Sequence, residues 1–284
     1  MPVVLTVAGS DSGGGAGIQA DLKTFEALGV FGVCAITCVT AQVPDRVTCA
    51  ESMSSILIAE QMLAVCRAFP VAVGKIGMLH SARVVETVAD QLERVQVSRW
   101  VLDPVTIATS GAPLLHPDAV ESLRARLLPM ATVVTPNVPE AEALWGHPVD
   151  SVQTLQAAAR AIGERYGLAC VVKGGHLHAE SARTPAPQTV VDALWDGRSV
   201  HLFEQRAVSA RETHGTGCTF SAALAARLAL GDPLPQAVRQ AQAFVARALA
   251  RSRPAGRHHP LGWAVAGPKI SEFFYCEHAN AYGA

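Results

Sequence analysis

Polar side chains that could bind a charged ligand follow the ends of successive apolar runs in this sequence. Asp103, Asn137 and Lys173 each stand directly or closely after such a run. If the runs are parallel strands of one open sheet, their carboxyl ends meet at a single edge, where ligands bind in such sheets. Carboxylate and amide oxygens suit Mg²⁺, and lysine ammonium groups suit phosphate oxygens, so this edge indicates a metal–nucleotide site. The residues that end the runs are Gly9, Ser10, Asp11, Gln42, Lys75, Asp103, Asn137 and Lys173.

A second candidate site is the glycine-containing turn at residues 214–218, with the sequence HGTGC. It directly precedes an apolar segment, residues 219–230, which we predict to be a helix. The first amide groups of a helix have no partner within the helix, and they stand at the positive end of its dipole. Phosphate oxygens bind well at such a position. The alternative is a turn that only lets the helix pack closely against the sheet.

A longer glycine-rich turn, residues 9–17 (GSDSGGGAG), opens the predicted helix that carries Asp21. Its small residues allow the backbone to approach a ligand, although a flexible connection between strand and helix explains the glycines as well. Gly74 and Lys75 lack the upstream glycine and the following Ser or Thr of a Walker A motif, and no acidic residue ends the second strand as a Rossmann fingerprint requires. Phosphates that bind here must therefore bind in another arrangement.

Apolar runs that alternate with helical patterns must position these residues. Most of the runs are continuously apolar, which is typical of parallel strands covered on both faces. The segments between them have apolar residues three and four positions apart, as helices do. Ser81 and Ser151 are the predicted N-caps of two such helices. This alternation predicts an α/β domain. The predicted strands are residues 3–8, 30–39, 72–76, 100–102, 132–134 and 169–172.

A TIM barrel would show the same alternation, but residues 189–208 argue against it. Two apolar segments there flank Asp196-Gly197, a strong signal for a hairpin turn. Two successive helices then follow, at residues 219–230 and 234–250, which breaks an eightfold pattern. We therefore predict a doubly wound, mostly parallel sheet that is flanked by helices on both faces and has a late antiparallel hairpin.

The composition restricts the partners of this chain. Its 284 residues are 50% apolar and carry a formal net charge of −1, so it can bury a sizeable core and has no general attraction for nucleic acid or anionic membranes. We predict neither as a partner. The N-terminus lacks the basic segment of a signal peptide, and the seven cysteines include no CxxC pair, so we expect a reduced, cytoplasmic protein. We also predict one domain over residues 1–251 and a tail of uncertain structure over residues 252–284.

Six motifs resemble those of the bacterial hydroxymethylpyrimidine/phosphomethylpyrimidine kinases, and they occur in the order of that family. The resemblance extends from about residue 4 to residue 250. It implies a ribokinase-like fold, a homodimer, and the transfer of phosphate from ATP, with Mg²⁺, to 4-amino-5-hydroxymethyl-2-methylpyrimidine and then to its monophosphate in thiamine biosynthesis. The motifs are residues 8–25 (AGSDSGGGAGIQADLKTF), 75–79 (KIGML), 103–105 (DPV), 135–142 (TPNVPEAE), 172–176 (VKGGH) and 213–221 (THGTGCTFS).

By this resemblance, five residues line a pocket for the pyrimidine. Two of them, Asp21 and Gln42, are expected to hydrogen-bond the aminopyrimidine ring. From its residue type alone, Asp21 is equally well interpreted as a surface residue of a short helix. The five residues are Gly9, Asp21, Gln42, Met78 and Val105.

The resemblance assigns the phosphate end of the site to a second group. Asp103 and Glu140 are expected to help bind Mg²⁺, Asn137 and Glu140 to bind the nucleotide, and Lys173 to approach its phosphates. From residue types alone, Asn137 and Glu140 also fit a helix capping box. The expected anion hole and catalytic turn consist of Gly215, Thr216, Gly217 and Cys218.

Cys218 stands where most ribokinase-like kinases place an aspartate base. A free thiol has a pKa of about 8.5, and a helix N-terminus lowers it, so a base role is chemically reasonable. The other role left open is that Cys218 only positions the substrate.

Departures from the family's pattern leave the acceptor open. Thr106 stands where family members usually have Met, and Val43-Pro44 follows Gln42 where Asn-Thr is common. Close relatives also phosphorylate pyridoxal or pyridoxine, so a vitamin B6 kinase is the alternative within the enzyme class. The alternative outside it is a pyrimidine-binding protein without turnover.

Overall fold

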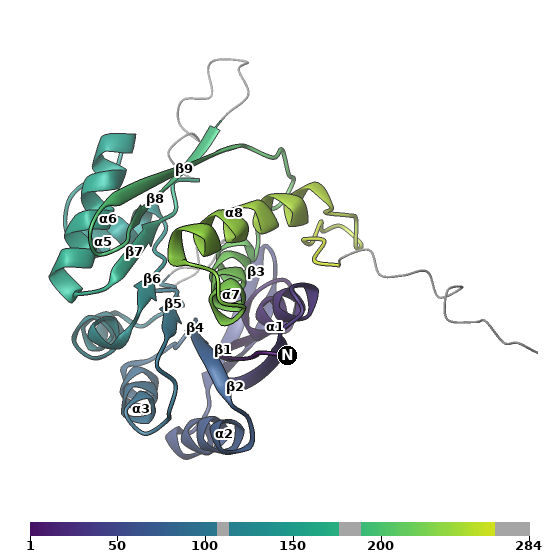
Figure 1. Cartoon of the computed structure of the whole chain (residues 1–284). Helices are drawn as coiled ribbons and strands as arrows, with labels where there is room; N and C mark the ends of the chain where they lie inside the picture. The colour runs from purple at the N-terminus through teal and green to yellow at the C-terminus, as the bar shows by residue number, and fades with distance from the viewer. Residues whose placement is uncertain (107–113, 176–188, 265–284) are drawn as a thin grey trace, which may run out of the picture.

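The computed structural model describes residues 1–106, 114–175 and 189–264, and every structural statement below refers to them. These residues form a nine-stranded sheet with the order β3-β2-β1-β4-β5-β6-β7-β8-β9 (Figure 1). The six central strands from β2 to β7 are parallel, and β3, β8 and β9 are antiparallel to their neighbours. The strands are β1 (Val3–Asp11), β2 (Phe31–Val43), β3 (Arg46–Ser52), β4 (Val71–Ile76), β5 (Trp100–Leu102), β6 (Val133–Val134), β7 (Ala169–Val172), β8 (Thr189–Trp195) and β9 (Val200–Arg206).

Helices cover both faces of the sheet, and each face has its own apolar core. One group, α1, α7 and α8, lies together on one side, and the remaining helices lie on the other (Figure 1). The predicted doubly wound α/β fold with a late hairpin is confirmed. The helices are α1 (Gly17–Ala27), α2 (Ser55–Ala68), α3 (Ala82–Leu92), α4 (Pro117–Ser122), the short π and 3₁₀ segments Leu123–Leu127 and Leu128–Met130, α5 (Val138–Trp145), α6 (Val152–Tyr166), α7 (Thr216–Ala229) and α8 (Leu234–Ala250).

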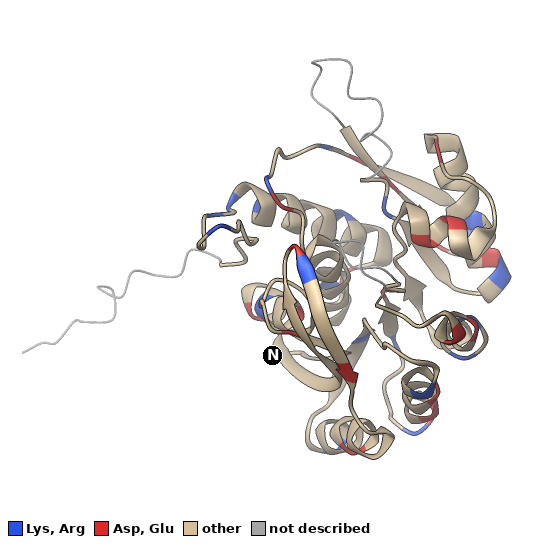
Figure 2. Cartoon of the chain, turned by 180° about the vertical axis from the view of Figure 1, so that it is seen from behind, with Lys and Arg blue, Asp and Glu red and all other residues tan. Residues whose placement is uncertain are grey.

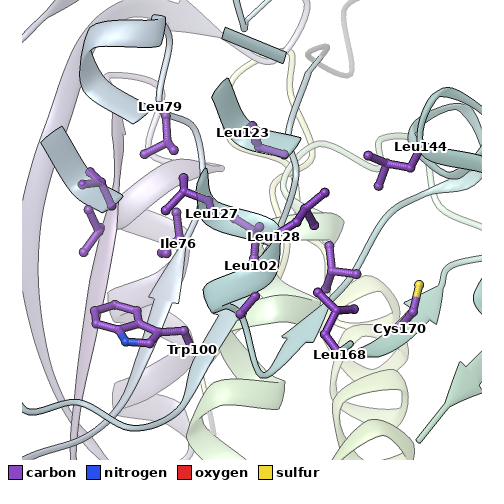
Figure 3. Close-up of a cluster of buried hydrophobic side chains, with 14 of the residues drawn as sticks. Ile76, Leu79, Trp100, Leu102, Leu123, Leu127, Leu128, Leu144, Leu168 and Cys170 are labelled. Carbon is purple, nitrogen blue, oxygen red and sulfur yellow. The ribbon is translucent and has the colours of Figure 1, made fainter. Parts of the chain in front are cut away.

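The larger core packs against one face of strands β4, β5, β6 and β7. Figure 3 shows Leu127 and Leu128 beside Ile76 and Leu102, all of which are buried. Strands β5 and β7 are buried at every position, which explains why their sequences are continuously apolar. Since Asp103 and Lys173 directly follow these two strands, this packing fixes where their side chains begin.

Several predicted elements agree with the structure residue by residue, and others needed correction. Strands 100–102 and 169–172 and helix 234–250 have the predicted bounds. The helix expected from residue 219 begins instead at Thr216, so the glycine turn forms its first turn. Ser151 caps its helix through its side chain, whereas Ser81 stands at the N-cap without a side-chain hydrogen bond.

The sequence analysis missed β3 and α2. Strand β3 lies at the sheet edge and has exposed residues at Arg46, Thr48, Cys49 and Glu51, so it shows no apolar run. Helix α2 exposes Ile56 and Leu57, which obscures its amphipathic pattern. β3 lacks an apolar run because it is exposed, and α2 lacks a one-sided apolar pattern because some of its apolar residues face solvent.

Beyond residue 251, the described part of the chain contacts the main body. Trp263 is buried, and its Nε1 donates a hydrogen bond to Thr219 Oγ1 at 3.0 Å. Leu261 is buried in the same core as α7 and α8. The division of the chain at residue 251 remains a prediction.

Charged residues are mixed along the chain. Figure 2 shows basic and acidic positions interspersed over the helices rather than gathered on one side. In the described ranges, none of the helices combines the length and the apolar character that crossing a bilayer requires.

Candidate active site

A small cavity lies where β1, β2 and β4 reach their carboxyl ends. Four of the five predicted substrate-binding residues line it, namely Gly9, Gln42, Met78 and Val105, and so does Cys218 from the first turn of α7. Residues far apart in the sequence thus meet as the resemblance implies. The full lining is Gly9, Ser10, Asp11, Ala16, Gly17, Thr40, Gln42, Lys75, Met78, Val105, Leu114 and Cys218.

Close packing determines the shape of this cavity. A Cβ atom at Gly9 would stand 2.7 Å from Cys38 Sγ and 3.2 Å from Met78 Sδ, so a larger residue would displace the wall. Gln42 accepts a hydrogen bond at its Oε1 from Thr40 Oγ1 (3.1 Å), and its backbone N–H donates to Ser12 Oγ (2.8 Å). These contacts hold the Gln42 amide at the cavity.

Asp21 does not line the cavity, which contradicts the direct contact expected of it. Its side chain is 0% exposed, and both carboxylate oxygens are taken by Lys75 Nζ (3.1 and 2.9 Å) and Thr6 Oγ1 (2.6 Å). The alternative that Asp21 is a surface residue of a short helix is also wrong, because its side chain is fully buried. Lys75 lies at the cavity in its place, and the Asp21 charge raises the pKa of Lys75 against the opposing effect of burial. A lysine inside an apolar strand required such a counter-charge, and that signal could have identified the pair.

The N-terminus of α7 is the predicted anion site. Gly215 is the N-cap with φ of +84°, and no acidic residue lies in the first turn. A Cβ atom at Gly217 would stand 3.4 Å from Lys173 Nζ and 3.8 Å from Asp103 Oδ2. The predicted anion site therefore borders Lys173, which was assigned to the phosphates, and Asp103, which was assigned to the metal.

Asp103 and Lys173 form an ion pair, with Oδ1 and Nζ 3.0 Å apart. Asp103 also accepts hydrogen bonds from Thr135 Oγ1 and Ser221 Oγ, each at 3.1 Å. Burial alone would raise the pKa of Asp103, but the charges of Lys173 and Lys75 outweigh it and lower the pKa. Both partners of the pair are therefore charged at neutral pH.

Asn137 and Glu140 form the capping box of α5 that their spacing permitted. Glu140 N–H donates to Asn137 Oδ1, and Asn137 N–H donates to Glu140 Oε2, each at 2.9 Å. Burial, supported by the charge of Asp103 and opposed by that of Lys173, raises the pKa of Glu140 to about 7. Asn137 and Glu140 therefore have a structural role at the N-terminus of α5.

The residues near Asp103 fit a magnesium ion that is held mainly by a nucleotide. In the described ranges no three His, Cys, Asp or Glu side chains gather as an ion cage. Mg²⁺ is commonly bound through one or two carboxylates together with substrate phosphates. Asp103 and Glu140 would supply these carboxylates; burial is the main cause of the raised pKa of Glu140, and the charge of Asp103 adds to it.

The thiol of Cys218 differs from the expectation. Burial raises its pKa to about 11, although Lys75 and a hydrogen bond from the Gly17 backbone N–H act in the opposite direction. Desolvation outweighs these two effects, so the thiol keeps its proton at neutral pH. The expected lowering of its pKa is wrong.

The sequence analysis placed Asp11 at the carboxyl edge of the sheet and His214 in the second glycine turn, but it gave neither residue a role of its own. The structure joins them, with His214 Nε2 and Asp11 Oδ2 3.0 Å apart. Asp11 ends β1 and His214 directly precedes the N-cap of α7, and only their contact across the fold distinguishes them.

Comparison with known proteins gives consistent results. The family described as "Phosphomethylpyrimidine kinase" matches residues 11–262. A hydroxymethylpyrimidine/phosphomethylpyrimidine kinase of Haemophilus influenzae is 47% identical over 256 residues, which cover 90% of this chain and 94% of that protein.

Two solved structures show the same fold. The phosphomethylpyrimidine kinase of Clostridium difficile has a TM-score of 0.74 and 35% identity, covering 86% of this chain and 98% of that one. The pyridoxal kinase of Bacillus subtilis, solved as an ADP complex, has a TM-score of 0.80 and 34% identity, covering 92% and 96%.

Proposed function

This chain belongs to the phosphomethylpyrimidine kinase family, and from that premise we propose that it phosphorylates 4-amino-5-hydroxymethyl-2-methylpyrimidine and then its monophosphate, with ATP as donor. The reactions place it in thiamine biosynthesis. We further propose Mg²⁺ as the metal, a homodimer as the assembly and the cytoplasm as the location.

One observation carries the proposal: Cys218 belongs both to the cavity wall and to the first turn of α7. The acceptor cavity and the anion site therefore share a boundary. Gly217, the preceding residue, borders Lys173 and Asp103 on the phosphate side. An alcohol in the cavity and a phosphoryl group at the helix N-terminus would meet at this boundary.

Phosphoryl transfer depends mainly on positioning and charge stabilisation, and the proposed residues supply both. The alcohol oxygen forms a bond to the γ-phosphorus, the bond from that phosphorus to the bridging oxygen breaks so that ADP leaves, and the alcohol proton passes to water or to an ionised Cys218. Lys173 and the α7 amide groups would stabilise the negative charge on the transferred group. Asp103 and Glu140 would hold Mg²⁺, which when bound would neutralise negative charge on the nucleotide phosphates.

Cys218 has two roles that its position permits. Its thiol can hold the alcohol by a hydrogen bond, which needs no ionisation. It can also accept the alcohol proton if substrate binding lowers its pKa from about 11. We favour the positioning role, because burial keeps the thiol protonated.

The decisive experiment is an acceptor panel. The purified protein is incubated with ATP and Mg²⁺ and with the pyrimidine alcohol, its monophosphate, pyridoxal or pyridoxine, and ADP formation is measured. We expect the highest kcat/KM with the two pyrimidines. Absence of ADP from both pyrimidines would reject the proposal.

A pyridoxal kinase is the second candidate, because a pyridoxal kinase is among the structures that share this fold at 34% identity. The same panel separates the two activities. A kcat/KM for pyridoxal above that for both pyrimidines would favour the second candidate. Binding of the pyrimidine in calorimetry without turnover would instead indicate a binding protein.

A further inference from the structure

Asp11 organises the first glycine-rich turn. It ends β1 and is 3% exposed. Its carboxylate accepts hydrogen bonds from three backbone N–H groups of the turn: Gly13 (2.8 Å), Gly15 (3.1 Å) and Ala16 (2.8 Å). Burial would raise the pKa of Asp11, but the hydrogen bonds from His214, Gly13 and Ala16 outweigh it and lower the pKa. The turn is therefore wrapped around a carboxylate that is ionised at neutral pH.

His214 connects this turn to the second one. It is 8% exposed and directly precedes Gly215, the N-cap of α7. Because an ionised carboxylate can only accept hydrogen bonds, His214 Nε2 is the donor of the 3.0 Å contact with Asp11 Oδ2. The ring also packs on Gly15, where an added Cβ atom would stand 2.7 Å from His214 Cδ2. One side chain thus touches both the carboxylate and the backbone that surrounds it.

The backbones of the two turns are also in direct contact. A Cβ atom at Gly215 would stand 1.8 Å from the carbonyl oxygen of Gly15. The two turns can therefore approach this closely only because residue 215 is a glycine. Gly17, the last residue of the first turn, lines the same cavity as Cys218, and its backbone N–H lowers the pKa of the Cys218 thiol. The first turn therefore reaches both the N-cap of α7 and the sulfur atom at the boundary of the two ligand sites.

We propose that Asp11 and His214 are positioning residues whose contact ties the first glycine-rich turn to the start of α7. This tie sets the place of Cys218 and of the anion site relative to the acceptor cavity. The inference rests on the proposed kinase function for its kinetic consequence, but the tie itself is a property of the fold. Neither residue needs to touch the transferred phosphoryl group.

The test compares His214→Leu with the conservative His214→Gln, which keeps an N–H donor of similar reach. His201→Leu is a matched control, because His201 makes a 2.6 Å contact with Asp196 in the β8–β9 hairpin, away from the cavity. For each variant, kcat, KM for both substrates and the melting temperature are measured. Amide hydrogen exchange is followed in peptides that cover residues 12–17 and 214–218.

We expect His214→Leu to lower kcat by about tenfold or more, since small displacements of reacting groups have large effects, while both KM values change less than threefold. Exchange should rise at residues 12–17, roughly 200 residues away in sequence from the substitution. His214→Gln should restore most of kcat, and His201→Leu should leave it unchanged.

Unchanged exchange at residues 12–17 and kcat within twofold of the parent protein would overturn the proposal. A loss of kcat that only matches the loss of folded protein, with no rescue by His214→Gln, would overturn it as well. If His214→Leu does not fold, His214→Asn, whose amide ends short of Asp11, takes its place. If the parent protein phosphorylates no acceptor, the proposed function fails, whereas the exchange measurement still decides whether the tie exists.

Discussion

Lys75 and Asp21 form an ion pair that is completely shielded from solvent. Their Nζ and Oδ2 atoms are 2.9 Å apart, and both side chains are 0% exposed. The pair links β4 to α1 beneath the acceptor cavity, with Lys75 in the cavity wall. It also places a positive charge near Cys218, whose pKa that charge lowers. The pair therefore connects the stability of the fold with the electrostatics of the site.

Asp21→Ala should lower the free energy of unfolding by about 3–5 kcal/mol, because it leaves the Lys75 charge buried without a partner. Adding Lys75→Met should recover part of that loss, since the unpaired charge is then removed. Urea denaturation followed by circular dichroism measures both. The exposed pair of Asp45 and Arg257 provides the control, and Asp45→Ala should cost less than about 1 kcal/mol. Equal losses for the two alanine variants would contradict this.

Gly217→Ala should separate phosphate binding from folding. The new methyl group would be in ordinary contact with Lys173 and Asp103, so the chain should fold, and alanine favours a helix by about 1 kcal/mol over glycine. The methyl group would enter the proposed anion site, and we expect kcat/KM for ATP to fall by about tenfold or more. Steady-state kinetics and thermal denaturation measure the two effects.

Gly215→Ala and Gly197→Ala are the comparisons for that variant. Both glycines have positive φ, but only Gly215 would meet a backbone atom, whereas nothing lies within 4 Å of a Cβ at Gly197. Gly215→Ala should therefore be much less stable than Gly197→Ala. A stable Gly217→Ala protein with unchanged kcat/KM for ATP would argue against the anion site.

Cys218→Ala should reduce kcat far more than it changes the KM of the pyrimidine. The thiol lies where the acceptor cavity meets the first turn of α7, so its loss affects the reacting hydroxyl rather than the ring. Cys218→Ser retains a hydrogen-bonding group and should keep more of kcat than the alanine variant. Initial rates at varied pyrimidine and ATP give these constants. Equal effects on kcat and KM, or none, would contradict a role in the transfer step.

Asp192 should make stability depend on pH. It accepts hydrogen bonds from Gly174 N–H (2.9 Å) and Gln242 Nε2 (3.0 Å), but burial outweighs them and raises its pKa to about 6. Since the pKa is raised in the folded state, its stabilising contribution is complete below about pH 4 and is lost as the pH rises through 6. The loss amounts to about 3 kcal/mol.

Urea denaturation at pH 4.5 and pH 7 tests this effect. Asp192→Asn removes the titrating group, so the parent protein should lose stability relative to this variant as the pH rises. Asp45→Asn, at an exposed position, should show the same difference from the parent protein at both pH values. A difference between the parent and Asp192→Asn that does not change with pH would refute the assignment.

The sequence alone determined the bounds of two fully buried strands and of one amphipathic helix. Strands β5 and β7 and helix α8 were predicted with their observed bounds, because covered strands and amphipathic helices show their periodicity directly. The resemblance placed Gly9, Gln42, Met78 and Val105 in one pocket, and these four residues line one cavity. Edge strand β3 was missed because its exposed face carries no comparable pattern.

Only the tertiary structure decided which charges are paired and which groups keep their protons. Asp21 was expected at the ligand but is buried against Lys75, and Cys218 was expected to have a lowered pKa but has a raised one. The contact between Asp11 and His214 joins residues that no local pattern relates. Desolvation and ion pairing depend on what surrounds a side chain in three dimensions, and residue type and spacing along the chain do not contain that information.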